Sequence, residues 1–170
     1  MRGQEGYAFI TASSACVPQL MQWFPTATSC HLWGGVDFRF PFTLESFIAD
    51  CQIERLASYV LIDPLGYMSA FGQYYLRLDR CHLGRLVVAP SVRGCGLGTQ
   101  LVRCLAQQGS RALGVSEISL FVAPANAGAE SLYARLGFRR EAYPDRSVDP
   151  AIYHYMVARV SALLAEPASA

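Results

Sequence analysis

The chain has 170 residues, a length typical of one domain. Hydrophobic residues make up 52% of it and charged residues 16%, with a formal net charge of +1. This composition excludes a disordered chain and disfavours nucleic acid as a partner, because phosphate binding needs clustered basic side chains. No run approaches the roughly 20 apolar residues of a membrane span, and the N-terminus lacks a signal-peptide pattern. We therefore expect a soluble, cytoplasmic protein with no nucleic acid and no membrane as partners.

The first half of the chain predicts a short strand, two helices and a loop. Residues 7–11 have the pattern of a strand, and Ser13 or Ser14 is placed to cap a helix that Pro25 ends. Residues 26–42 are rich in aromatic residues, Gly and Pro, which favours an ordered loop. Thr43, followed by Ser46, then opens a second helix.

The second half predicts alternating strands and helices. Strands are expected at 58–62, 68–78, 82–89, 118–123 and 153–160, a helix at 98–112, and a short helix from Asn126 that Gly137 closes. We assign residues 1–164 to a single domain of the α/β (α+β layered) class and expect residues 165–170 to fray.

The six cysteines form no CxxC pair and no tight cluster, so the sequence predicts neither a metal site nor a disulfide framework. We expect the cysteine thiols to be reduced and mostly buried.

The segment from Leu86 to Thr99 carries the chemical signal: a buried strand runs through a glycine-rich turn into an amphipathic helix. Glycines 94, 96 and 98 let backbone N–H groups converge at the positive end of the helix, where a pyrophosphate is the natural ligand. A nucleotide P-loop is excluded because no Lys follows the turn, and a dinucleotide fingerprint is excluded because the spacing is GxGxG. A glycine-rich turn without a ligand stays open at this point.

The flanking residues resolve this choice. The pattern Q/R-x-x-G-x-G/A is matched by Arg93, Gly96 and Gly98, with Val88 and Pro90 before it and Asn126, Tyr133 and Gly137-Phe138 after it. This pattern resembles the GCN5-related N-acetyltransferase family over residues 7–160.

The resemblance implies a central mixed, mostly antiparallel twisted sheet of six to seven strands flanked by about four helices. It also implies acetyl-CoA as cosubstrate, and a non-catalytic acyl-CoA-binding sensor or interaction domain is the alternative. By the resemblance, the residues that contact the cofactor are Leu86, Val87, Val88, Arg93, Gly94, Cys95, Gly96, Leu97, Gly98, Thr99, Asn126 and Tyr133.

Acetyl transfer to an amine requires proton movement. An alkylammonium with a pKa of about 10.4 costs roughly 4.6 kcal/mol to deprotonate at pH 7, and the departing thiolate benefits from a proton donor. By resemblance, Tyr133 is the donor, and a core aromatic is its alternative role. Some relatives carry a Glu base at the position of Phe121, which cannot act here, so His82 becomes the predicted base. A structural role for His82, and water relayed to Asp79 or Glu141, stay open.

The acceptor is the least specified part of the prediction. The resemblance places it near residues 23–47 and 143–151, where aromatic residues would form either walls of a site or part of the core. Small-molecule amines, peptide N-termini and lysines are all compatible with this pattern, and a homodimer is left open.

Overall fold

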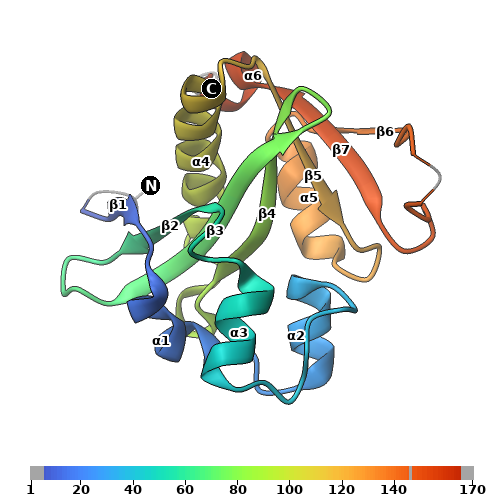
Figure 1. Ribbon diagram of the computed structural model, residues 1–170. Helices are drawn as coiled ribbons and strands as arrows, with labels where there is room; N and C mark the ends of the chain where they lie inside the picture. The colour runs from blue at the N-terminus through green and yellow to red at the C-terminus, as the bar shows by residue number, and fades with distance from the viewer. Residues whose placement is uncertain (1–5, 146, 166–170) are drawn as a thin grey trace. The chain divides into compact units, whose positions relative to one another are not determined.

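The computed structural model describes residues 6–145 and 147–165 (Figure 1). In chain order its elements are β1 (Ala8–Thr11), η1 (Ser14–Cys16), α1 (Val17–Met21), α2 (Ala27–Gly34), α3 (Leu44–Cys51), β2 (Ala57–Ile62), β3 (Met68–Arg77), β4 (Arg80–Val88), η2 (Pro90–Val92), α4 (Leu97–Leu113), β5 (Glu117–Val122), α5 (Ala127–Arg135), β6 (Arg139–Glu141), β7 (His154–Arg159) and α6 (Val160–Leu164).

The strands form one seven-stranded sheet in the order β1-β2-β3-β4-β5-β7-β6. The pairs β1–β2, β2–β3, β5–β7 and β6–β7 are antiparallel, whereas β4 and β5 run parallel. The predicted mixed, mostly antiparallel sheet is therefore confirmed, and the described residues hold more helices than the four expected.

The chain divides into two compact units. Among the described residues, the first unit comprises 6–74 and 85–102, and the second comprises 75–84, 103–145 and 147–165. Strands β3 and β4 and helix α4 each contribute residues to both units.

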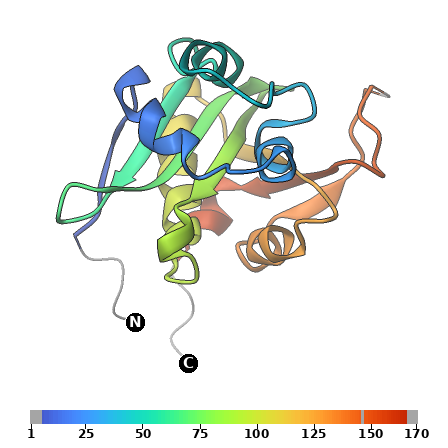
Figure 2. The ribbon, with the colours of Figure 1, turned by 90° about the horizontal axis from the view of Figure 1, so that it is seen from below.

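Aromatic rings form the core of the first unit. Trp33 of α2 stacks on Phe24 with a centroid distance of 4.3 Å and lies 5.7 Å from Phe47 of α3. The ring of Phe71 in β3 lies 6.2 Å from Trp33, so α2 packs onto the sheet through this contact. Figure 2 shows α3 lying over one face of the first unit's strands. Such packing favours tilted and offset ring pairs and excludes water from their shared surface.

The structure corrects the prediction for residues 26–42, because a helix, α2, occupies Ala27–Gly34. Thr26 accepts a hydrogen bond from the backbone N–H of Ser29, while the Ser29 hydroxyl accepts one from Thr26 N, which is a reciprocal capping box. The predicted helix before it is also shorter than expected. It ends at Met21, not at Pro25, and the side chain of Ser13 makes no capping bond.

The second helix prediction is confirmed, since Thr43 and Ser46 form a capping box that opens α3. The turn between β2 and β3 also forms as expected: Asp63 Oδ1 accepts hydrogen bonds from the N–H groups of Leu65 and Tyr67. Such Asx bonds stabilise a turn by replacing backbone partners.

Helix α5 of the second unit ends in a Schellman motif, as Gly137 and Phe138 predicted. The N–H of Phe138 donates to Tyr133 O at 3.0 Å, and that of Gly137, at φ 99°, donates to Ala134 O. The rings of Tyr133 and Phe138 lie 5.8 Å apart and complete the motif. Strand β6 and helix α6 were not predicted, and residues 166–170 of the expected frayed tail lie outside the described residues.

Candidate active site

The predicted glycine turn belongs to the first unit and opens α4, a helix of 17 residues. Gly94 and Gly96 have φ values of 77° and 82°, which side chains with a Cβ rarely adopt. A Cβ built on Gly94 would meet nothing within 4 Å, so backbone conformation and not space requires glycine there. Because the first N–H groups of α4 lack intrahelical acceptors, this turn is suited to an anion.

The strand that leads into the turn is irregular at Arg85. Parallel pairing of β4 with β5 covers Cys81–Leu83 and Ile118–Leu120, and Arg85 follows with a left-handed φ of 50°. Its guanidinium donates to Gln73 Oε1 and to the carbonyl of Asp50, each at 3.0 Å. These two bonds hold the strained residue in place, so Leu86, Val87 and Val88 follow a fixed break in the strand.

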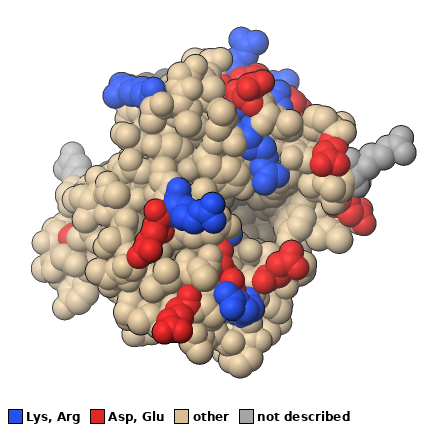
Figure 3. All heavy atoms as spheres, in the orientation of Figure 1, with Lys and Arg blue, Asp and Glu red and all other residues tan. Residues whose placement is uncertain are grey.

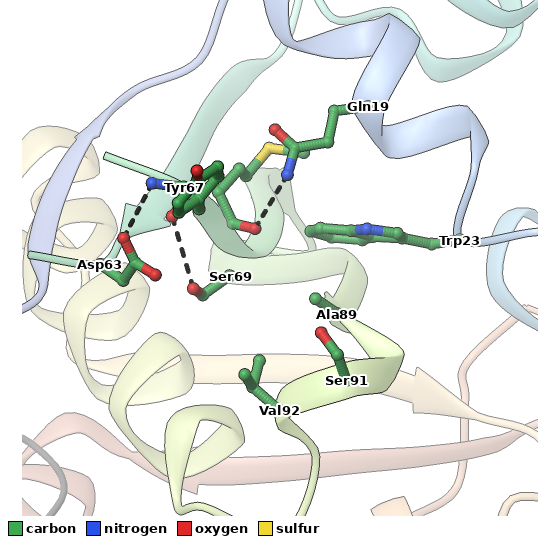
Figure 4. A pocket seen from close by; sticks show the side chains of 9 residues that line it. Gln19, Trp23, Asp63, Tyr67, Ser69, Ala89, Ser91 and Val92 are labelled. Carbon is green, nitrogen blue, oxygen red and sulfur yellow. Dashed lines mark hydrogen bonds between the residues drawn. The ribbon is translucent and has the colours of Figure 1, made fainter. Parts of the chain in front are cut away.

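A cavity of about 280 Å³ lies beside the end of β4 within the first unit. Figure 4 shows the side chains of Gln19 and Trp23 on one side of this space and those of Ser91 and Val92 on the other. Its polar groups are largely engaged locally, because Gln19 Nε2 donates to Met68 O and Asp63 accepts from its own turn. The residues lining it are Gln19, Trp23, Asp63, Tyr67, Met68, Ser69, Ala89, Ser91 and Val92.

Asn126 is the N-cap residue of α5, and Tyr133 lies on this helix, both in the second unit. Asn126 Oδ1 accepts from the N–H of Ala129 at 3.4 Å, so this side chain caps the helix as predicted. Tyr133 is 9% exposed, and burial raises the pKa of its hydroxyl to about 12. The phenol therefore keeps its proton at any pH near neutrality.

His82 lies on β4 in the second unit and is 2% exposed. Its Nδ1 is 2.9 Å from Ser119 Oγ, and the rings of Tyr75 and Phe121 lie 5.1 and 5.0 Å away. Burial, followed by the positive charge of Arg77, lowers the pKa of His82 to about 3. The imidazole is consequently neutral throughout the physiological range.

A cluster of aromatic rings surrounds His82, and sequence reasoning did not find it. Phe121 lies 5.1 Å from Tyr143 and 5.3 Å from Tyr155, and the Arg77 guanidinium lies 5.2 Å from the centre of its ring. We call Tyr75, Phe121, Tyr143 and Tyr155 the aromatic cluster. Tyr75 and Arg77 are close in the sequence and lie on the same face of β3, so this pair could have indicated the cluster. The other rings come from β5, β7 and the segment before β7, and no sequence pattern connects them.

Of the aromatic residues expected near the acceptor in the first unit, Phe38 is buried, whereas Trp33, Phe40 and Phe42 are half-buried. Phe38 is 3% exposed and packs 5.0 Å from Phe47, and Phe42 packs on the same ring. These contacts pack Phe38 and Phe42 against α3, and a role of these rings in the acceptor site stays a prediction.

The sequence predictions also concern the cysteines, the possible metal ligands and the surface charges. Among the described residues, all six cysteines are free, and no group of three or more His, Cys, Asp or Glu side chains could hold a metal. Burial raises the pKa of Cys51 and Cys81 to about 12, whereas Cys95 in the glycine turn is exposed. Within the described ranges no helix has the length and apolarity of a membrane span. The face drawn in Figure 3 carries interspersed charges of both signs.

Comparison with known proteins agrees with this geometry. The model of the acetyltransferase (GNAT) family matches residues 19–138, more than half of the chain. A spermidine N-acetyltransferase from Vibrio cholerae, solved with CoA and spermine, superposes with a TM-score of 0.71 at 16% identity, covering 95% of this chain and 100% of that one. The aminoglycoside acetyltransferase AAC(6')-Ib, solved with paromomycin and acetyl-CoA, gives 0.72 at 21% identity, covering 93% and 96%.

These solved structures share the fold, and the family match covers the strand, the glycine turn, α4 and α5. The chain therefore belongs to the acetyltransferase (GNAT) family and is an acetyl-CoA-dependent N-acetyltransferase.

Proposed function

We propose that this chain binds acetyl-CoA along residues 86–99 and transfers the acetyl group directly to a small primary amine. The observation that carries the proposal is the turn formed by Gly94 and Gly96 at the start of a 17-residue helix. The first N–H groups of a helix have no intrahelical acceptor and can bind an anion. A diphosphate placed there gains charge-assisted hydrogen bonds and a favourable helix dipole.

The remaining cofactor contacts follow from the strand before the turn. We infer that the pantetheine arm pairs with the backbone of Leu86, Val87 and Val88, which follow the break at Arg85. Arg93 donates from Nε to Val88 O at 3.2 Å and has its other guanidinium N–H groups available for a phosphate, together with the amides of Cys95, Leu97 and Thr99. Gly98 lets the cofactor approach the helix, and Asn126 and Tyr133 supply contacts from α5.

Tyr133 is the proposed proton donor to the departing CoA sulfur. With a pKa of about 12, it holds its proton at pH 7, whereas a thiol has a pKa of about 8.5. Full transfer to the thiolate would be uphill by roughly 5 kcal/mol at these values. We therefore propose that the hydroxyl donates a hydrogen bond as negative charge develops on sulfur, and that the proton lost by the amine finally resides on the thiol.

The role of His82 as base stays a prediction, and its pKa restricts the form that role can take. A group with a pKa of about 3 is a poor acceptor for a proton from an ammonium of pKa about 10.4. Losing that proton to bulk water at pH 7 costs roughly 4.6 kcal/mol, which is less than transferring it to His82. We propose that the acceptor reaches the site as the free amine and that neutral His82 orients it through a hydrogen bond.

Release of free CoA with a panel of amines tests the proposal. The panel should contain monoamines, polyamines, amino acids, aminoglycosides, peptides and lysine side chains. All 14 basic residues of the chain are arginine, so acetylation of its own lysine side chains cannot contribute to the signal. We expect release with at least one small amine and a large loss of kcat in Tyr133→Phe.

Tyr7→Phe is the matched control, because it removes a hydroxyl from a half-buried tyrosine that lies outside the cavity and outside residues 86–99. If acetyl-CoA raises the melting temperature but no acceptor in the panel yields CoA, the proposed transfer to a small primary amine fails. Equal kcat in Tyr133→Phe and the wild type would remove Tyr133 from the mechanism.

A further inference from the structure

Arg77 of β3 is a half-buried cation held between aromatic groups of the second unit. Its guanidinium carbon lies 5.6 Å from the centre of the Tyr75 ring and 5.2 Å from that of Phe121. The hydroxyl of Tyr143 accepts from Nη1 at 3.1 Å, and that of Tyr75 lies 3.5 Å from Nη2. None of the ion pairs within the described part of the chain includes Arg77.

Arg80, across the same hairpin, has a different environment. Its Nε lies 2.8 Å from Glu117 Oε2 and its Nη2 lies 3.2 Å from Glu141 Oε2. Two carboxylates therefore balance the charge of Arg80, whereas the hydrogen-bond and ring partners of Arg77 among residues 6–145 and 147–165 are neutral hydroxyls and rings. Because a guanidinium carries five N–H donors in a planar fork, two hydroxyl acceptors leave donors of Arg77 available for a further oxygen ligand.

The position of Arg77 relative to His82 limits what that ligand can be. Tyr75 and Phe121 each contact both groups, since their rings also lie 5.1 and 5.0 Å from the His82 ring. An acceptor whose amine lies beside His82 would thus extend over these two rings to reach Arg77. Its charged end there would have to be an anion.

We propose that the acceptor is a primary amine that carries a carboxylate on an aromatic or apolar body, and that Arg77 binds this carboxylate. This inference rests on the proposed function. The guanidinium fork matches the two carboxylate oxygens, and charge-assisted bonds of this kind are roughly twice as strong as neutral ones. The aromatic cluster contacts the body of the acceptor, and Tyr143 steadies the guanidinium. A polyamine or aminoglycoside would instead bring positive charge toward Arg77 and be repelled.

Acceptor pairs that differ only in the carboxylate test the inference. Phenylalanine and phenethylamine, tyrosine and tyramine, and leucine and 3-methylbutylamine are compared by CoA release, with phenylalaninamide as a neutral member that resembles a peptide N-terminus. We expect kcat/KM in the wild type to be at least tenfold higher for the carboxylated member of a pair. In Arg77→Gln this preference should fall at least tenfold, through a higher KM for the carboxylated member.

The two amines of a pair differ in amine pKa, and this difference affects the wild type and the variant equally. Comparing the ratio of kcat/KM within a pair between the two proteins therefore removes it. Activity of Arg77→Gln on the uncharged-body amines shows that the variant is folded and catalytic. Arg111→Gln is the matched control: it removes the same charge from an exposed position on α4 and should leave the preference unchanged.

Two outcomes would overturn the inference while leaving the proposed function intact: turnover of the amines without a preference for the carboxylate, or a preference that survives Arg77→Gln. Efficient use of phenylalaninamide would favour peptide N-termini and would also contradict it. If no acceptor turns over, the proposed function fails. Saturation-transfer NMR with CoA present then shows whether the wild type binds phenylalanine better than phenethylamine, and equal binding would refute the carboxylate site as well.

Discussion

Lowering the pH from 7 to 5 should destabilise the wild-type protein by about 2 kcal/mol more than it destabilises His82→Gln. In the unfolded chain His82 should titrate near 6.5, whereas in the folded protein its pKa is lowered to about 3 by burial and by Arg77. Between these two values the unfolded state binds more protons, so the free energy of unfolding falls as the pH falls. The loss is about 1.4 kcal/mol for each pH unit once the pH is well below 6.5.

The size of this loss of stability depends little on the pKa of His82 in the folded protein. At pH 5 a group with a folded pKa of 3 or 4 is unprotonated in the native state, so the cost is set mainly by the distance of pH 5 from 6.5. Because the ring of His82 is only 2% exposed, solvent screening does not reduce the expected loss of stability. Glutamine at position 82 does not titrate and can still form a hydrogen bond with Ser119, which makes it a suitable comparison.

Urea unfolding at pH 7.0 and pH 5.0, at constant ionic strength, measures the effect. Both tryptophans, Trp23 and Trp33, lie in the first unit, so far-UV circular dichroism should be followed beside fluorescence to report on the second unit. The difference between the two proteins in their pH dependence isolates His82 from every other titrating group. An equal pH dependence in wild type and His82→Gln would show that the folded pKa is close to 6.5 and that the ring is available as an ordinary base.

Three further changes probe the site and its support. Tyr133→Phe should lower kcat by about 100-fold with little change in the KM for acetyl-CoA, measured by CoA release, because loss of one hydrogen-bond donor to a developing negative charge costs a factor of about this size. An unchanged kcat would contradict the role of Tyr133 as that donor. Gly96→Ala should lower the free energy of unfolding by about 1–2 kcal/mol, because Gly96 has a φ of 82°. It should also weaken the rise in melting temperature that acetyl-CoA causes. An undiminished rise would show that the turn is not the anion site. Gln73→Leu should lower the free energy of unfolding measured with urea by about 3 kcal/mol. The fully buried amide of Gln73 forms hydrogen bonds with the Cys51 carbonyl, Ser58 and Arg85. A loss below about 1 kcal/mol would mean that these partners form other hydrogen bonds in the variant.

The parts of the fold that the sequence predicted have local causes. The capping box of Thr43 and Ser46 and the Schellman motif at Gly137 each depend on residues within six positions of one another. Helix α4 was predicted from leucines at 97, 101 and 105, which are all buried, and the glycine turn before it depends on the conformations of single residues.

Helix α2 shows where local reasoning failed. Thr26 and Ser29 form the same capping box as Thr43 and Ser46, but the following residues include aromatic and glycine residues that are weak helix formers. The helix has almost no one-sided apolar pattern, and it is stabilised by the stacking of Trp33 on Phe24 and Phe47. Those partners come from other elements, so only the folded chain brings them together.

The sequence by itself determined the family, the cofactor and the position of the glycine turn, because these depend on glycines and a helix start that are contiguous in the chain. Tertiary structure decided the surroundings of His82 and Arg77. His82 is an ordinary titrating residue in the sequence, but Tyr75, Phe121 and Arg77 surround it from other strands and keep it neutral. Arg77 likewise resembles any other arginine until folding brings two carboxylates to its neighbour Arg80 and brings rings and hydroxyls to Arg77. Protonation and charge balance depend on groups brought close in space, and residues distant in the chain supply them here.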